Sequence, residues 1–261
     1  MTGPAHTDGG APRTDGAAGI HDDAGDLMRW LERRLAAGDE GRLLGRGYQG
    51  SIHLYASPVG DVVVKRAPSS GLSGMLGRRT LRREARIYES LRGVPGTPRS
   101  FGLLGGRYLV LEHVPGPSLR ELDDRLADPE RFYARLLRTI EGLHAAGVAH
   151  GDLKRKNNIL VGPGESPYLI DFGIALRCKP DSPAWKRGAF GLVRQMDYNA
   201  WIKHKYGRSP KDLSPEDAAR YRPLLLERVA RAIRIPWQKI TLRRLRKRLR
   251  DPSQDRSRFR R

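Results

Sequence analysis

The spacing of apolar residues changes once along the chain, and this change constrains the fold more than any other feature. Before residue 115, apolar residues form short runs rich in β-branched side chains, which are typical of strands. These runs are residues 52–54, 62–64 and 108–114. Residues 80–91 form one helical pattern among them, and helical spacing dominates from Pro129 onward. With Pro115-Gly116-Pro117 between them, the sequence predicts a β-rich half with one helix and a helix-rich half.

The composition limits the partners and the cellular compartment. The 261 residues suffice for one large domain or two lobes, and they carry a net charge of +20. This charge indicates phosphate-bearing partners (nucleotides, nucleic acids or an anionic membrane), although a coding bias towards arginine would also explain it. The single Cys178 excludes an internal disulfide framework and fits a reducing cytosol. Because no apolar run approaches ~18 residues and no secretory signal is visible, we expect a cytoplasmic protein.

The expected organisation has four segments. Residues 1–24 offer little to bury and are predicted to be disordered. Residues 25–114 form an N-terminal lobe, which opens with a short helix capped by Asp26. Residues 115–236 form a C-terminal lobe, and residues 237–261 form a basic tail. The apolar face of the short helix is expected to consist of Leu27, Trp30, Leu31 and Leu35.

A glycine-rich stretch, GRGYQGSI, covers residues 45–52. A dinucleotide-binding turn would require a helix to open at these glycines. Alternating and β-branched residues follow instead, which favours a hairpin. A hairpin with glycines at its tip can cover phosphate groups with its backbone N–H groups, and a plain β-turn remains an alternative.

Lys65 and Glu84 form the next candidate pair. Lys65 ends the run of three valines, where a lysine commonly marks the point at which a strand reaches water. Glu84 shares a helix face with Leu81, Tyr88 and Leu91, so it should point inward. A buried carboxylate is costly unless it is paired. Lys65 is the natural partner, and together they could hold an ammonium group against nucleotide phosphates.

These motifs, followed by HGDLKRKNN at 150–158 and DFG at 171–173, occur in an order that resembles the protein kinase superfamily. The resemblance covers roughly residues 43–205 and implies an α+β, two-lobed, protein-kinase-like fold with a shortened helical C-lobe. It also implies the use of Mg-ATP. Asp152 would orient the acceptor hydroxyl and take its proton, while Lys154 would neutralise the transferred phosphoryl group. Asn157 and Asp171 would bind Mg²⁺.

The resemblance further implies an ATP site on the N-terminal lobe and the hinge. The backbone of Glu112 and Val114 would bind the adenine base, and Leu111 would close the rear of the pocket. The ATP-binding residues implied by the family pattern are Gly45, Gly47, Gly50, Ile52, Lys65, Glu84, Glu112 and Val114.

Several residues of the catalytic stretch have other interpretations. Gly151 stands where many members of the family carry an arginine, which argues against control by phosphorylation of the activation segment. His150 is interpreted as a packed core residue, and Arg155 with Lys156 as a solvated basic turn. Asp197 lies in a predicted helix, where it could support the backbone of the catalytic loop or be an ordinary exposed residue.

The pattern predicts a phosphotransferase similar to Ser/Thr protein kinases, with reduced bacterial and RIO-like kinases as the nearest forms. A lipopolysaccharide-core sugar kinase that acts on a lipid-linked sugar at the inner membrane surface is the alternative, and a pseudokinase binding module is a third. The tail has leucines at 242, 245 and 249 among basic residues. It is predicted either to bind an anionic membrane from the cytoplasmic side or to dock on the C-terminal lobe. Nucleic acid is the weakest candidate partner.

Overall fold

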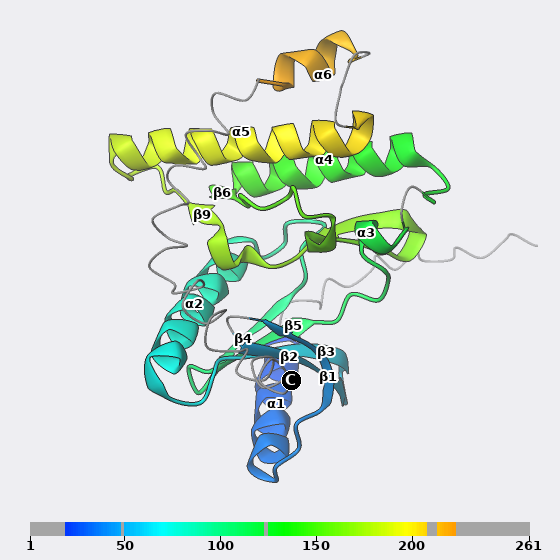
Figure 1. Cartoon of the computed structure of the whole chain (residues 1–261). Helices are drawn as coiled ribbons and strands as arrows, with labels where there is room; N and C mark the ends of the chain where they lie inside the picture. Colours follow the sequence, from blue (N-terminus) through cyan, green and yellow to red (C-terminus); the bar gives the residue numbers. More distant parts are fainter. Residues whose placement is uncertain (1–18, 48–49, 123–124, 208–212, 223–261) are drawn as a thin grey trace, which may run out of the picture. The chain divides into compact units, whose positions relative to one another are not determined.

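The computed structural model describes residues 19–47, 50–122, 125–207 and 213–222. The chain forms two compact units (Figure 1). The N-terminal unit reaches Glu89 and includes Pro98–His113, and the C-terminal unit contains Ser90–Thr97 and the chain from Val114 onward. The predicted basic tail at 237–261 lies outside the described residues. Among the described helices, none is long and apolar enough to cross a membrane.

A five-stranded antiparallel sheet forms the centre of the N-terminal unit, with the order β1-β2-β3-β5-β4. The strands are β1 (Arg42–Gly47), β2 (Gly50–Ser57), β3 (Gly60–Arg66), β4 (Ser100–Leu104) and β5 (Tyr108–Glu112). The sequence analysis did not predict β4. Its signal was Gly105-Gly106, which adopts positive φ angles of 54° and 66° and joins β4 to β5 as a tight hairpin.

One face of this sheet is apolar and is covered by helix α1 (Gly19–Ala36). Strand residues that lie opposite one another point to the same face, so Tyr55, Val62, Val64 and Val110 form one surface. Leu27 and Leu31 of α1 pack on that surface, with Met28, Trp30 and Leu35 at its edges. The predicted apolar face of this helix is therefore correct.

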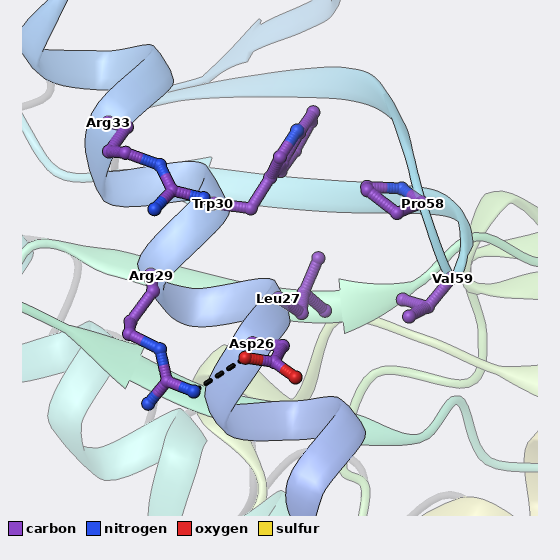
Figure 2. Close-up of a pocket in the computed structure, with 7 residues that line it drawn as sticks. All are labelled: Asp26, Leu27, Arg29, Trp30, Arg33, Pro58 and Val59. Atoms are coloured by element: carbon purple, nitrogen blue, oxygen red, sulfur yellow. Dashed lines mark hydrogen bonds and ion pairs between the residues drawn. The ribbon is translucent and has the colours of Figure 1, made fainter.

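The predicted start of α1 is wrong. Residues 19–24, expected to be disordered, belong to the helix. Asp26 lies inside α1 and pairs with Arg29 at 2.5 Å instead of capping the helix. A pocket of about 220 Å³ opens between α1 and the β2–β3 turn, lined by residues that include Arg29, Trp30 and Pro58 (Figure 2). None of the predicted site residues lines this pocket.

Helix α2 (Gly71–Ser90) carries Glu84 and begins well before the predicted residue 80. Its first half contains glycines, which have a low helix propensity and conceal the helix in the sequence. Gly74 is buried, and a Cβ atom there would lie 2.9 Å from the carbonyl oxygen of Pro68. Close packing of the backbone therefore explains at least one of these glycines. Leu81, Glu84, Tyr88 and Leu91 are all buried, as their common spacing predicted.

The C-terminal unit is mainly helical, and α4 (Pro129–Ala145) packs along α5 (Ala184–Tyr206) (Figure 1). The indole of Trp201 is buried and its Nε1 donates to the carbonyl oxygen of Tyr133 at 2.8 Å, which joins the two helices. Shorter elements complete the unit. They are α3 (Leu119–Leu122), α6 (Pro215–Arg220), β6 (Val148–Ala149) paired with β9 (Leu176–Arg177), and β7 (Ile159–Gly162) paired with β8 (Ser166–Leu169).

Candidate active site

The glycine-rich stretch is the hairpin between β1 and β2, as predicted. Gly45 lies opposite Ile52, and Gly47 lies opposite Gly50, so no helix opens at the glycines and the dinucleotide-binding alternative is excluded. Gly50 has a φ of +135°, and a Cβ atom there would lie 1.8 Å from the carbonyl oxygen of Arg66. Only glycine fits this position, which lets β2 start beside the end of β3.

Lys65 and Glu84 meet in the N-terminal unit. Lys65 points to the face of the sheet opposite α1, where it shares a cross-strand row with Ile52 and Leu109. Its Nζ lies 2.5 Å from Oε1 of Glu84, whose side chain is 1% exposed while that of Lys65 is 15% exposed. Since a carboxylate buried this deeply needs a cation, the pair fixes the ammonium group at the surface of the sheet. The role of Lys65 in nucleotide binding stays a prediction.

The predicted adenine-binding residues lie where β5 ends. Leu111 is buried in β5, and Glu112 is the last residue of the strand rather than part of a run to residue 114. Glu112 forms two hydrogen bonds with the backbone of Arg99. The Glu112 N–H donates to the Arg99 carbonyl oxygen at 2.8 Å, and Oε2 of Glu112 accepts from the Arg99 N–H at 2.9 Å. Val114 is buried and belongs to the C-terminal unit.

In the C-terminal unit, Asp152, Lys154 and Asn157 share one loop between β6 and β7. Asp171 follows β8, the partner strand of β7, and the N–H of Ile170 donates to the Asn158 carbonyl at 3.0 Å. This bond brings the backbone next to Asn157 and the backbone next to Asp171 to the same end of the β7–β8 hairpin. A buried hydrogen bond joins two residues of the loop, because Nδ2 of Asn158 donates to the carbonyl oxygen of Asp152 at 3.2 Å.

Asp197 of α5 holds the backbone at the start of this loop through hydrogen bonds. Its side chain is 1% exposed, so the exposed-residue interpretation is wrong. Its Oδ2 accepts from the backbone N–H of His150 and its Oδ1 from that of Gly151, both at 2.8 Å. Gly151 has a φ of +77°, which a side chain would strain, and this conformation aims both N–H groups at one carboxylate.

His150 is a packed core residue, as predicted. It is fully buried, and its Nδ1 accepts from the Asp152 N–H at 3.3 Å. Its Nε2 therefore carries the proton and donates to the carbonyl oxygen of Ile170 at 3.0 Å. The ring also lies 4.8 Å from that of buried Phe172. His150 thus links the loop that carries Asp152 to the segment that carries Asp171.

Arg155 and Lys156 lie in a turn and Arg155 is exposed, as predicted, but solvent is not the only partner of Arg155. Nε of Arg155 lies 3.2 Å from Oδ2 of Asp152. Lys156 begins a short 3₁₀ turn and is only partly exposed. The sequence did not predict this ion pair, because the apolar residues around Asp152 show no helical spacing. A turn nevertheless brings residues three apart into contact.

His204 of α5 is a further support that sequence reasoning missed. Its Nε2 donates to the carbonyl oxygen of Leu153 at 2.7 Å. Burial disfavours the charged ring and lowers the pKa of His204 below its ordinary value of 6.5; nearby Lys156 lowers it too, while the hydrogen bond to Leu153 opposes the shift. The hydrogen bond of this ring to Leu153 therefore holds the loop. No sequence signal pointed to it, because the contact spans 51 residues.

The donor types at the end of the β7–β8 hairpin fit magnesium. Mg²⁺ is a hard ion that proteins bind through one or two carboxylates together with substrate phosphates, so a dedicated protein cage is not required. Asp171 offers a carboxylate and Asn157 an amide oxygen, and Asn157 is exposed. Asp171 has a left-handed backbone with a φ of 66°, an unusual conformation for a residue other than glycine.

A glycine hairpin followed by a Lys–Glu pair, a loop with Asp152 and Asn157, and an Asp-Phe-Gly turn define the class of protein-kinase-type phosphotransferases. A family model described as the protein kinase domain matches residues 39–200. The chain therefore belongs to the protein kinase family. The resemblance that the motifs indicated is confirmed, as is the α+β fold.

The chain is also similar to several relatives, some of which are kinases by name. A putative cyclin-dependent kinase F-2 from Oryza sativa is 31% identical over 61% of this chain and 56% of its own. The EKC/KEOPS complex subunit BUD32 from Encephalitozoon cuniculi is 31% identical over 53% of this chain and 71% of its own. The serine/threonine-protein kinase PknH from Mycobacterium bovis is 32% identical over 51% of this chain and 24% of its own. The chain thus spans just over half of the rice relative.

Proposed function

We propose that this protein transfers the γ-phosphoryl group of Mg-ATP to a serine or threonine hydroxyl of a protein acceptor. The observation that carries the proposal is the loop containing Asp152 and Asn157, whose backbone is held by His150, Asn158, Asp197 and His204. Such rigidity suits phosphoryl transfer, which depends on positioning and on neutralising charge more than on covalent chemistry.

Each residue of the proposed site has one task. Asp152 accepts the proton of the acceptor hydroxyl, and Lys154 neutralises the phosphoryl group as it moves. Asn157 and Asp171 would hold magnesium, which neutralises the phosphate oxygens when bound. Lys65, kept in place by Glu84, would contact the nucleotide phosphates, and the glycine hairpin would cover them.

Asp152→Asn and Asp171→Asn test this assignment. Asp152→Asn should lower the turnover about 10²–10⁴-fold and leave ATP binding nearly intact, because this carboxylate acts on the acceptor. Asp171→Asn should instead remove Mg²⁺-dependent ATP binding. The measurements are phosphate transfer from labelled ATP and calorimetric titration with ATP, with and without Mg²⁺.

Asp181→Asn is the matched control, since Asp181 is an exposed aspartate in the same unit. It should change neither quantity. Wild-type protein that binds Mg-ATP but labels neither itself nor any protein fraction would favour a pseudokinase. If neither Asp152→Asn nor Asp171→Asn had an effect, the site would be assigned wrongly.

A further inference from the structure

The ion pair between Arg155 and Asp152 has no evident structural purpose. The side chain of Arg155 is 54% exposed and that of Asp152 is 9% exposed. An exposed arginine held by a single carboxylate contributes little to folding, because solvent screens the charges. The turn itself is already fixed by the backbone, through the Arg155 N–H and the Asp152 carbonyl at 3.2 Å. The guanidinium therefore sits beside the proposed base for another reason.

The chemistry of the guanidinium points to an anion. It carries five N–H donors in a planar fork that matches carboxylate and phosphate oxygens. The ion pair with Asp152 uses Nε, and the fork includes two further NH₂ groups. An acceptor that presents its hydroxyl to Asp152 would meet this half-exposed cation beside the carboxylate.

The segment that follows the Asp-Phe-Gly turn is also rich in basic residues. Strand β9 pairs with β6, and the Cys178 N–H donates to the Gly147 carbonyl at 2.8 Å, so the segment after the Asp-Phe-Gly turn is tied to the start of the catalytic loop. From residue 176 to residue 188 this segment has one acidic residue, Asp181. Its basic residues are Arg177, Lys179, Lys186 and Arg187. A segment with this excess of positive charge attracts anions and repels basic peptides.

We propose that Arg155 selects the acceptor, by binding an acidic group that flanks the reacting hydroxyl in an acidic peptide segment. This inference rests on the proposed transfer to protein hydroxyls and names the substrate class. An acidic group on the acceptor competes with Asp152 for the guanidinium. An acidic acceptor thus docks beside the base and loosens the ion pair at its Oδ2, which can then accept from the hydroxyl.

Serine peptides that differ only in flanking residues (aspartate, alanine or lysine) test the proposal. Wild-type protein should prefer the aspartate peptide, and the preference should weaken as salt rises. Arg155→Gln should lower kcat/KM for the aspartate peptide about 10- to 100-fold, mainly through KM, and should change the alanine peptide little. The kcat/KM of Arg155→Lys for the aspartate peptide should lie between those of the wild type and Arg155→Gln, because lysine keeps the charge and loses the planar fork of donors.

Arg138→Gln is the matched control, since it removes the same charge from an exposed position on α4 and should not alter the preference. Binding of fluorescein-labelled peptides, followed by anisotropy, separates recognition from transfer. Should Arg155-dependent binding persist while nothing is phosphorylated, the proposed transfer fails and the recognition stands.

Three results would overturn the role of Arg155. One is a wild-type protein that treats the three peptides alike. Another is an equal loss for all peptides in Arg155→Gln, which would mean that Arg155 only orients Asp152. The third is Arg155-dependent binding to phosphatidylglycerol vesicles without binding to the aspartate peptide, which would assign the site to a lipid headgroup.

Discussion

The most deeply buried carboxylates among the described residues, Glu84 in one unit and Asp197 in the other, are satisfied in different ways. Glu84 in the N-terminal unit meets the side chain of Lys65. Asp197 in the C-terminal unit meets the backbone N–H groups of His150 and Gly151, and also Nε2 of His144 at 3.1 Å. Both side chains are 1% exposed. Glu84 thus holds the side chain of Lys65, whereas Asp197 fixes the course of the backbone at His150 and Gly151.

The difference predicts unequal costs of removal. A lysine that loses its carboxylate partner can move its ammonium group into water, because the side chain is long and flexible. A buried backbone N–H cannot turn, since the chain fixes its direction, and it costs about 1–3 kcal/mol when left unsatisfied. Removing Asp197 should therefore damage the fold more than removing Glu84.

The largest expected effect is that of Asp197→Ala. It leaves two backbone N–H groups and one imidazole nitrogen without their acceptor, so the free energy of unfolding should fall by about 3–5 kcal/mol. Urea unfolding followed by circular dichroism measures this change. Asp181→Ala, at an exposed position, should stay within about 0.5 kcal/mol of the wild type. A loss under about 1 kcal/mol for Asp197→Ala would show that water replaces the carboxylate.

A smaller effect is expected for the Lys65–Glu84 pair, tested by a double-mutant cycle with Lys65→Met and Glu84→Gln. The coupling free energy of ATP binding should be about 1–3 kcal/mol, because the two side chains are in contact and partly shielded from water. Calorimetric ATP titration of the four proteins gives this value.

The neighbouring strand residue provides the control for this cycle. Nη1 of Arg66 lies 3.1 Å from Oε1 of Glu40, whose side chain is 68% exposed. The same cycle on this pair should give at most about 0.5 kcal/mol, as expected for an exposed ion pair. If the effects of the two substitutions on the free energy of ATP binding were strictly additive, the ion pair would not contribute to nucleotide binding.

The smallest effect concerns His204, which supports the same loop as Asp197 does. Its pKa in the folded protein lies below the ordinary 6.5, so the unfolded chain binds more protons near that pH. The stability from His204 is therefore complete above pH 6.5 and is lost as the pH falls towards its folded pKa. Urea unfolding between pH 8 and pH 5 should show this decline, and His204→Gln should flatten it. An equal decline in the variant would assign the pH dependence to other groups.

The sequence was informative where function depends on residues close together in the chain. The glycine hairpin, the run that ends in Lys65 and the loop with Asp152 and Asn157 are local patterns, and the alternation of apolar residues places each on a strand or a turn. Helix ends were less well predicted. Residues 19–24 and 71–79 contain glycine or polar residues, yet they belong to helices whose other residues pack against the protein.

By itself, then, the sequence determined the family, the order of the motifs and the inward direction of Glu84, because each depends on spacing within one segment. Only the tertiary structure decided what holds the loop that carries Asp152 and Asn157. Asp197 reaches His150 and Gly151 across 47 and 46 residues, and His204 reaches Leu153 across 51. The tertiary structure also decided that α1 covers the sheet and that Arg155 contacts Asp152. A hydrogen-bond partner is a property of position in space, and no periodicity in a single segment encodes it.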